Sequence, residues 1–210
     1  MMRRHMFLGL VLFTSLIALQ PNLASAAPQD QNALDELNPF DPNIEQTLQE
    51  LDQDYEQETG LPSHLNSDFL RPFDATSGCY RLTCTVYAQI SKSEQYVYIY
   101  INGKQTYAWP VSTGADGYET PNLDTHPNGR IYDSYTSTKY PGGDYNGLGN
   151  MPYAVFIKGG FAIHGTGQGN WRRLGSPASH GCIRLHPDNA KLFNRLVRQY
   201  GIFDVWITVQ

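Results

Sequence analysis

The sequence predicts a mostly β domain with one helix near its C-terminus, preceded by a flexible acidic arm. Three observations support this prediction: β-branched and aromatic runs after residue 79, frequent turn formers (19 Gly and 13 Pro), and helical periodicity in one late segment. Hydrophobic residues make up 40% of the 210-residue chain, so it can bury a core and is not wholly disordered. Beyond the N-terminus no apolar run is long enough to cross a membrane, which excludes a multi-span membrane protein.

The first 26 residues have the composition of a secretory signal peptide. Arg3 and Arg4 supply a positive start, Met6–Leu19 is the apolar stretch, and Ala24–Ala26 offers small residues for cleavage. The apolar stretch is short for a membrane span, and no Cys near the cleavage site provides a lipid anchor. We expect cleavage after Ala26 and an exported chain; an uncleaved N-terminal anchor is the alternative.

Residues 27–78 form a strongly acidic segment. They contain twelve Asp or Glu and a single basic residue, Arg71, whereas residues 79–210 contain twelve Lys or Arg and eight acids. A charge asymmetry of this size marks a boundary near Gly78. The chain therefore divides into a signal peptide, an acidic linker or arm at 27–78, and a domain at 79–210.

One amphipathic helix is expected inside the acidic arm. Asp41-Pro42 offers a helix start with Pro at the first helical position, and Gly60 offers a stop. The apolar residues between them recur at helical spacing: Ile44, Leu48, Leu51 and Tyr55. We favour a solvated spacer around this helix; the alternative is a docking helix or a cover over the basic domain.

The domain itself is expected to begin with hairpins and to end with a helix and a strand. Asn102-Gly103 is a strong hairpin signal, Gly159-Gly160 marks a second turn, and Gly201 should end the helix. The expected elements are strands over 95–101, 105–111, 154–158 and 161–164, a helix over 187–200 and a closing strand over 202–209.

The cysteines suggest one disulfide. They form no CxxC pair, so a structural zinc ribbon is not indicated. Exported thiols oxidise, and Cys79 and Cys84 are close in sequence, whereas Cys182 is far from both. We therefore expect a Cys79–Cys84 disulfide and a free thiol at Cys182. The pairing requires a turn within Tyr80–Thr83, because bonded Cα atoms lie within about 7 Å of each other.

Reactive side chains concentrate between Ala162 and His186. His164 ends an expected strand, and Ser179-His180-Gly181-Cys182 follows a Gly-rich loop. A thiol becomes a good nucleophile when a neighbouring imidazole takes its proton. Glycines permit the tight turn that an oxyanion-binding loop requires. Considered alone, Cys182 is equally well explained as a buried structural cysteine.

The arrangement as a whole resembles the signature of L,D-transpeptidase catalytic domains of the YkuD type. In that signature a His and a spacer precede Ser/Thr-His-Gly-Cys, and here His164 lies fifteen positions before Ser179 and eighteen before Cys182. The resemblance covers about residues 85–209. Other segments that resemble the family are Val111–Gly114, Glu119–Pro121, Met151–Tyr153 and Leu174–Ser179.

The resemblance implies a β-sandwich of mixed sheets and an enzyme that acts on peptidoglycan stem peptides in the periplasm or cell-wall space. The Cys182 thiolate would attack the bond between the L-centre of a diaminoacid and the terminal D-Ala, and release D-Ala. An amine of a second stem would then take the acyl group, which gives a 3→3 cross-link. No cofactor, metal or nucleic acid is implied, and we expect a monomer.

Individual residues also acquire roles from the resemblance. Cys182 matches the nucleophile and His164 the general base, which the carbonyl oxygen of Gly165 would orient. His180 matches a supporting His, and the N–H groups of Gly181 and Cys182 match an oxyanion site. The candidate substrate-binding residues are Arg184, Ser179, Tyr153 and Tyr145; a loop-holding role for Ser179 and core packing for either Tyr are the alternatives.

Two departures from the family pattern affect the surroundings of the site. Arg184 stands where many members have Asn. If Ile183 packs inward on a strand, Cys182 and Arg184 point to the same open side, where a guanidinium can bind a stem carboxylate. The alternative is a structural Arg184 that holds the Gly-rich loop through backbone carbonyls. The second departure is that Thr120-Pro121 is separated from Pro127–Gly129 by NLDTH.

Other functions also fit parts of this pattern. A carboxypeptidase or amidase on the same scaffold would use water instead of the acceptor amine, and a protein-anchoring enzyme would use an amine of a wall-anchored protein. His180, Cys182 and His186 could ligate zinc together with His164, although no HExxH or CxxC supports this. A wall-binding module without catalysis would not require Cys182.

Overall fold

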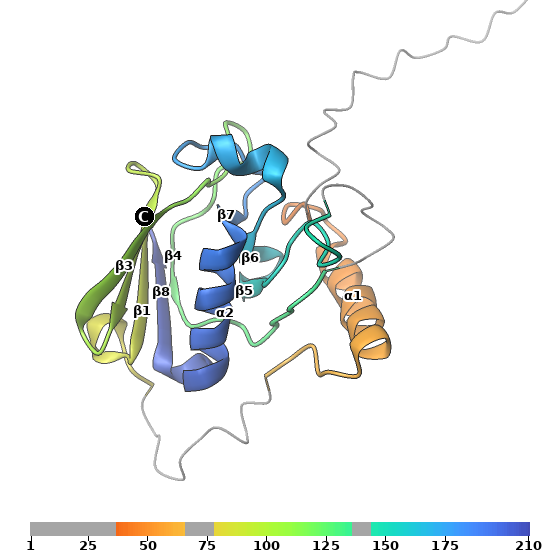
Figure 1. The fold of residues 1–210 in the computed structure, drawn as a ribbon, viewed down its shortest axis with the longest axis horizontal. Helices are drawn as coiled ribbons and strands as arrows, with labels where there is room; N and C mark the ends of the chain where they lie inside the picture. Colours follow the sequence, from red (N-terminus) through yellow and green to blue (C-terminus); the bar gives the residue numbers. More distant parts are fainter. Residues whose placement is uncertain (1–36, 66–77, 136–143) are drawn as a thin grey trace, which may run out of the picture.

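The computed structural model describes residues 37–65, 78–135 and 144–210. Figure 1 shows two β-sheets with one helix between them and a second helix at the edge of the molecule. The predicted signal peptide at 1–26 and its cleavage site lie outside the described residues. Among the described residues, neither α-helix combines the length and the hydropathy that crossing a bilayer requires.

A five-stranded mixed sheet forms one side of the domain, in the order β3-β2-β1-β8-β4. Its strands are β1 (Val86–Ser91), β2 (Tyr96–Ile101), β3 (Lys104–Pro110), β4 (Leu123–Thr125) and β8 (Val205–Val209). β1 and β8 are parallel, and the other neighbours are antiparallel. The hairpin at Asn102-Gly103 is confirmed, because both residues have the positive φ (49° and 74°) of a tight hairpin turn.

A three-stranded mixed sheet, β5-β6-β7, forms the other side. Its strands are β5 (Val155–Lys158), β6 (Phe161–Gly165) and β7 (Ile183–Leu185). Side chains alternate across this sheet. Ile163 and Ile183 face the core that the two sheets share, whereas Ala162 and Cys182 belong to a second buried cluster on the outer face.

The helix α2 (Pro187–Tyr200) stands between the two sheets in Figure 1. Its Phe193 and Val197 are buried in the same core as residues of β1, β6 and β8. The remaining helical segments are short 3-10 turns: η3 (Arg81–Thr83), η4 (Gln168–Arg173) and η5 (Ile202–Asp204). The expected closing strand therefore begins at Val205, after η5. The prediction of a mostly β fold with mixed sheets and one helix near the C-terminus is confirmed.

An ion-pair cluster fastens α2 to the segment before the second sheet. Asp133 accepts two hydrogen bonds of 2.7 Å from Arg195 and lies 3.2 Å from an amino group of Arg198. Partial burial alone would raise the pKa of the Asp133 carboxyl. The Arg195 hydrogen bonds and the nearby charge of Arg198 outweigh this effect, and they hold that pKa below its usual value.

The helix expected in the acidic arm is α1 (Ile44–Thr59). Gly60 ends it in the left-handed conformation (φ 66°), as its position predicts. The helix begins two residues later than expected, because Asp41–Asn43 form a turn ahead of it. Pro42 therefore lies outside the helix and not at its first position.

The helix α1 packs against the domain. Leu48, Leu51 and Tyr55 are buried with Tyr132 and Phe156 over the outer face of the three-stranded sheet. The interpretation as a flexible, solvated spacer is therefore wrong for residues 37–65, and the docking alternative describes them. Burying an apolar side chain of this size stabilises a fold by about 1.5–3 kcal/mol. The excess of acidic residues in 27–78 gives no information about this contribution.

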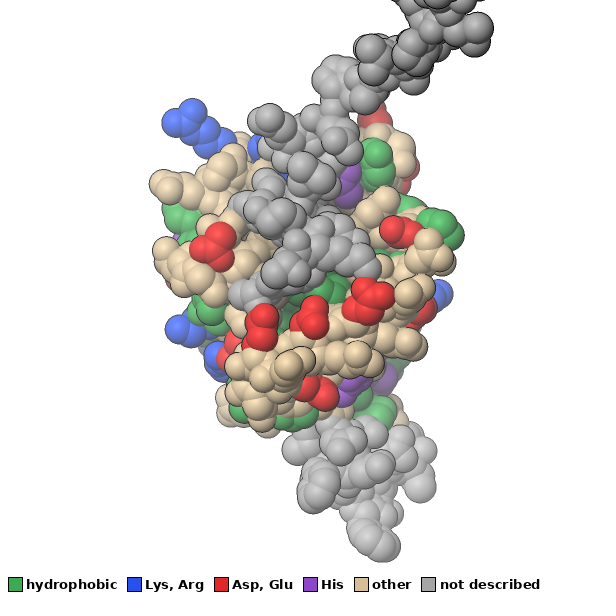
Figure 2. Space-filling view, turned by 90° about the vertical axis from the view of Figure 1, so that its right-hand side faces the viewer, with side chains coloured by type: hydrophobic (Ala, Val, Ile, Leu, Met, Phe, Trp, Pro, Cys, Tyr) green, Lys and Arg blue, Asp and Glu red, His purple; other side chains and the backbone are tan. Residues whose placement is uncertain are grey.

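Polar contacts complete the docking of α1. Arg130 donates to Asp52 over 3.0 Å and lies 3.4 Å from Glu45, while the Tyr132 hydroxyl also donates to Asp52. Burial, together with this bond, raises the pKa of Tyr132 well above its usual value. The other acids of the helix face solvent, and Figure 2 shows Asp and Glu side chains gathered over α1. The helix therefore binds by one mostly apolar face and carries its charge outward.

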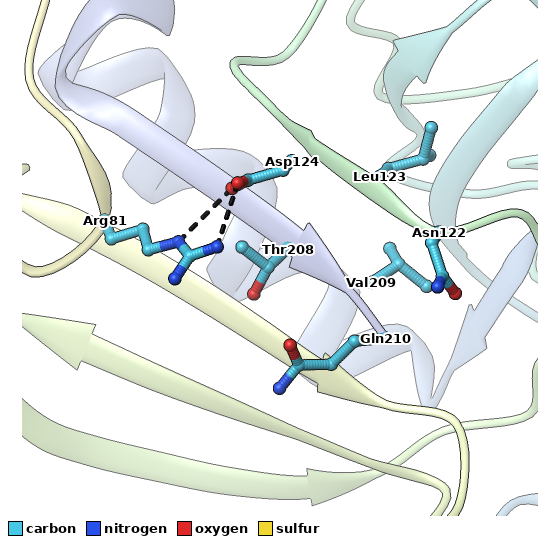
Figure 3. Close-up of a pocket in the computed structure, with 7 residues that line it drawn as sticks. All are labelled: Arg81, Asn122, Leu123, Asp124, Thr208, Val209 and Gln210. Carbon is cyan, nitrogen blue, oxygen red and sulfur yellow. Dashed lines mark hydrogen bonds and ion pairs between the residues drawn. The ribbon is translucent and has the colours of Figure 1, made fainter.

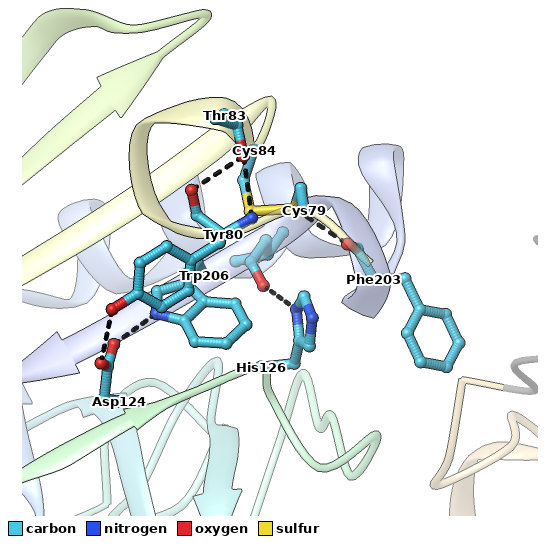
Figure 4. The surroundings of a disulfide bond; sticks show 9 residues. Cys79, Tyr80, Thr83, Cys84, Asp124, His126, Phe203 and Trp206 are labelled. Atoms are coloured by element: carbon cyan, nitrogen blue, oxygen red, sulfur yellow. Dashed lines mark hydrogen bonds between the residues drawn. A yellow bond between two sulfur atoms is a disulfide. The ribbon is translucent and has the colours of Figure 1, made fainter. Parts of the chain in front are cut away.

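The structure contains a disulfide between Cys79 and Cys84, whose Cα atoms are 4.8 Å apart (Figure 4). The required turn is η3, in which Arg81 has φ 49° and the Thr83 N–H donates to the Tyr80 carbonyl oxygen. The sulfur of Cys79 lies 3.1 Å from the carbonyl oxygen of Phe203. The disulfide thus closes the turn that leads into β1 and holds it beside the start of β8.

Replacing both disulfide cysteines, as Cys79→Ser/Cys84→Ser, is expected to lower stability by about 2 kcal/mol, because the bridge closes only a short loop. For a domain of this size the Tm should fall by about 4–8 °C. The same bridge predicts one free thiol in denatured, unreduced protein treated with a thiol reagent. Three free thiols would show that the bond is absent.

Asp133→Asn is expected to destabilise the protein at neutral pH by about 1 kcal/mol, a value reduced for partial exposure of the carboxyl. The folded pKa of Asp133 is lowered, so its contribution is present above the unfolded pKa near 4 and is lost as the pH falls through the folded value. Thermal melts should show the two proteins converging as the pH falls below about 4. The exposed Asp116→Asn is the control, and a constant gap at all pH values would contradict this role.

Candidate active site

Cys182 and His164 lie on neighbouring strand segments of the three-stranded sheet. His164 is in β6, and Cys182 immediately precedes β7. The two strands are parallel with His164 opposite Arg184, so the two-residue alternation of strands places His164, Cys182 and Arg184 on one face. The side chains of His164 and Cys182 are both fully buried, with 0% exposed. The structure thus brings the predicted nucleophile and base to the same side of the sheet.

The ring of His164 is held by the backbone of the next residue. Its Nδ1 lies 2.7 Å from the carbonyl oxygen of Gly165. A carbonyl oxygen only accepts, so Nδ1 carries the proton and the lone pair of the neutral ring is on Nε2. Gly165 has no room for a side chain, because a Cβ there would lie 2.9 Å from the Cα of Pro187. The contact expected of Gly165 as an orienting group is therefore present.

The loop Ser179–Cys182 is closed by its own hydrogen bonds. The Ser179 hydroxyl donates to the carbonyl oxygen of Cys182 over 2.6 Å and accepts from the Gly181 N–H over 3.1 Å. These bonds match the loop-holding alternative for Ser179. They also occupy the Gly181 N–H, so that group can serve an oxyanion only after the loop rearranges. Gly181 itself has φ 116°, a conformation that favours glycine.

A second segment, residues 111–120, which we call the strap, pairs with this loop. Ser112 and Arg184 exchange two backbone hydrogen bonds, and the Ala115 N–H donates to the Ser179 carbonyl oxygen. The Thr120 hydroxyl accepts from the Gly114 N–H and donates to the Gly181 carbonyl oxygen over 2.8 Å. The strap therefore fixes the backbone on both sides of Cys182.

The strap also contacts His180. The ring of Tyr118 packs edge-on against the His180 ring, with 4.9 Å between centroids. The sequence indicated this segment through the likeness of Val111–Gly114 and Glu119–Pro121 to the family pattern. It did not predict that the Thr120 hydroxyl would link the strap to Gly181 or that Tyr118 would contact His180. Neither contact has a sequence signal, because both depend on how a loop folds back over a distant strand.

Arg184 does not lie on an open surface. Its side chain is fully buried, and its Nη1 donates to the carbonyl oxygen of Ala178 over 2.7 Å. The prediction that Cys182 and Arg184 lie on the same side of the sheet agrees with the pairing of β6 and β7. That side is covered and not open. The contact with Ala178 is the one that the loop-holding alternative requires, and the substrate-anchoring hypothesis has no exposed group to support it.

The two candidate tyrosines lie in different surroundings. Tyr153 packs against the core that contains α2, with Lys191 and Arg195 over its ring at 5.7 and 5.8 Å. This matches the core-packing alternative. Tyr145 lies 6.4 Å from Trp171, ring to ring, near the end of β6, where Trp171 donates to the Thr166 carbonyl oxygen. Tyr153 also follows Pro152, whose carbonyl oxygen accepts from the Gly165 N–H at the end of β6.

His186, the third residue of the zinc hypothesis, caps α2. Its Nδ1 accepts from the Asp188 N–H, and its ring packs against Trp171 at 4.4 Å. Within the described ranges, no three His, Cys, Asp or Glu residues gather as a metal site would need.

A surface pocket of about 230 Å³ lies elsewhere, at the edge of the five-stranded sheet (Figure 3). Its walls come from β4, β8 and the chain end, and it contains the Arg81–Asp124 ion pair of 2.9 Å. It shares no residue with the strap or the Ser179–Cys182 loop.

The family model of the L,D-transpeptidase catalytic domain, YkuD, matches residues 85–202. A solved L,D-transpeptidase from Mycobacterium smegmatis is 24% identical, with 60% of this chain and 59% of that chain covered and a TM-score of 0.47. LdtMt1, solved in complex with imipenem, is 25% identical at the same coverage and TM-score. An L,D-transpeptidase from Mycobacterium tuberculosis H37Rv is 23% identical, with 60% and 58% covered and a TM-score of 0.44.

The chain thus spans less than two thirds of the length of these solved structures. No curated protein matches it.

Arg184→Gln is expected to lower stability by about 2 kcal/mol, because it removes a charged hydrogen bond and leaves the partly buried Ala178 carbonyl oxygen without that donor. The corresponding fall in Tm is about 4–8 °C. The exposed Arg172→Gln carries the same change of charge and should melt like the wild type. An unchanged Tm in Arg184→Gln would contradict the loop-holding role and return Arg184 to the candidates for substrate binding.

Proposed function

Because this chain belongs to the L,D-transpeptidase catalytic domain family, we propose that it is a cysteine acyltransferase that acts on peptidoglycan stem peptides. The observation that carries the proposal is the placement of Cys182 and His164 on one face of adjoining parallel strands. The Gly165 carbonyl oxygen holds the His164 ring in the tautomer that leaves Nε2 able to accept a proton.

The reaction proceeds in two acyl transfers. His164 Nε2 takes the proton of the Cys182 thiol, and the thiolate attacks the carbonyl carbon between the L-centre of the diaminoacid and D-Ala. D-Ala leaves with the proton that His164 returns, and the stem remains as a thioester on Cys182. The amine of a second stem then attacks the thioester and loses a proton to His164. The thiol is restored and a 3→3 amide bond is formed.

Export supports this assignment of substrate. The N-terminal composition is that of a signal peptide, and the Cys79–Cys84 disulfide suits an oxidising compartment. An exported chain with this domain would meet the wall polymer in the periplasm or the cell-wall space. Its domain at 79–210 has more basic than acidic residues, which favours approach to an anionic polymer.

The test is incubation of the purified protein with a disaccharide-tetrapeptide, with products identified by mass spectrometry. The wild type is expected to release D-Ala and to form a cross-linked dimer. Cys182→Ala should form neither product while its Tm stays near that of the wild type, because the first step needs a thiolate. A carbapenem should add its mass to the wild type but not to Cys182→Ala.

Other products point to other functions of the same scaffold. Tripeptide without dimer indicates hydrolysis, and coupling to an added protein amine indicates protein anchoring. Turnover by Cys182→Ala would contradict the thiol mechanism. Loss of activity with a chelator would favour the zinc alternative.

A further inference from the structure

The proposed nucleophile has no exposed surface, and the chain's own N-terminal segment lies beside it. Cys182 is 0% exposed and shares a buried cluster with Leu37, which is also 0% exposed. The Cys182 thiol lies 3.5 Å from the carbonyl oxygen of Gly160, in the turn between β5 and β6. The atoms that lie on this turn come from Pro39, Ile44 and Glu45, outside the domain that carries the proposed catalytic residues.

Two glycines show how closely this segment approaches. A Cβ at Gly160 would lie 2.9 Å from the Cα of Pro39 and 2.6 Å from Cγ1 of Ile44. A Cβ at Gly181 would lie 2.9 Å from both Pro39 and Phe40. Contacts this short do not occur for real side chains, so the segment sits directly on the backbone at both places. Gly181 precedes Cys182 in sequence, and the Gly160 carbonyl oxygen contacts the sulfur of Cys182.

The ring of Phe40 lies between β6 and the strap. Its ring packs edge-on against Phe161 of β6, with 5.3 Å between centroids, and lies 6.4 Å from the ring of Tyr118. Tyr118 in turn packs on His180, which precedes Gly181 in the Ser179–Cys182 loop. An apolar ring that is still 48% exposed therefore bridges the two walls of the site.

The helix α1 holds the segment in this position. Its apolar face is buried on the outer side of the three-stranded sheet, and Asp52 is bonded to both Arg130 and Tyr132. Figure 1 shows α1 beside β5 and β6, on the side opposite α2. At the far end of the arm, Ser63 and Leu65 pair with the segment at 129–131. The helix is therefore anchored along its length.

We propose that residues 37–40, which we call the cover, together with α1 form a built-in inhibitory element that must leave before Cys182 can react. The inference rests on the proposed function, because an acyl donor has to bring its carbonyl carbon to the sulfur. A thiol with no exposed surface cannot be approached in this way. The cover and the acyl donor compete for the same surface, so docking of α1 sets the fraction of molecules that can react.

The test measures alkylation of Cys182 by iodoacetamide in the full, unreduced protein, read by mass spectrometry. Leu48→Glu places a charge in the buried face of α1 and is expected to accelerate alkylation at least tenfold. Gln49→Glu adds the same charge at the next, exposed position of the helix and should react like the wild type. Digestion with a Glu-specific protease reports undocking, because α1 contains several Glu residues and each variant adds one.

A second pair of variants leaves the sequence of the arm unchanged. It tests the same proposal if Leu48→Glu does not fold. Gly160→Ala introduces a methyl group that collides with Pro39 and Ile44, so it should also accelerate alkylation. Gly169→Ala adds a methyl group where nothing lies within 4 Å and is the matched control. Wild-type alkylation rates in a folded variant whose α1 is cut rapidly would overturn the proposal. So would a wild type that reacts as fast as free cysteine.

Release of D-Ala from a tetrapeptide separates this proposal from the proposed function. If both are correct, Leu48→Glu gains alkylation and D-Ala release together. Faster alkylation with no D-Ala release in any variant would uphold the cover and contradict the transpeptidase assignment. Equal D-Ala release by the wild type, Leu48→Glu and Gln49→Glu would uphold the assignment and contradict the cover.

Discussion

The parallel pairing of β6 with β7 is the constraint on which the site depends. It places His164 and Cys182 on the same face of a short sheet although eighteen positions separate them in sequence. The opposite face of the same two strands supplies Ile163 and Ile183 to the core. The residues that stabilise the sheet and the proposed catalytic residues therefore alternate along the same strands, and a shift of register by one residue would exchange them.

The backbone around Cys182 is held from two sides. Ser179 closes the loop from within, and the strap fixes it from outside through Thr120 and its pairing with Arg184. Arg184 adds a buried hydrogen bond to Ala178. Such a loop varies little in shape, which suits the role proposed for Cys182, because nucleophilic attack requires a defined direction. The same bonds direct the Gly181 N–H inward, so binding of an oxyanion there requires the loop to exchange one partner for another.

Sequence patterns predicted what depends on local conformation and spacing. Asn102-Gly103 indicated its hairpin, Gly60 the end of α1, and the His164–Cys182 spacing the family. They did not predict the docking of α1, because an amphipathic face shows that a partner is needed but not where it lies. The burial of Arg184 was left undecided for a related reason: alternation along a strand gives the face, whereas the distant segments that cover that face determine its burial.

The burial of Cys182 also has a redox consequence. All three cysteines lie in the described ranges, and Cys182 is the one outside the disulfide. In an oxidising compartment an accessible catalytic thiol is exposed to sulfenic acid formation and to exchange with other disulfides. Oxidants must reach the sulfur to react with it, so burial in the cluster that also contains Leu37 protects the thiol of the proposed nucleophile as long as this cluster stays closed.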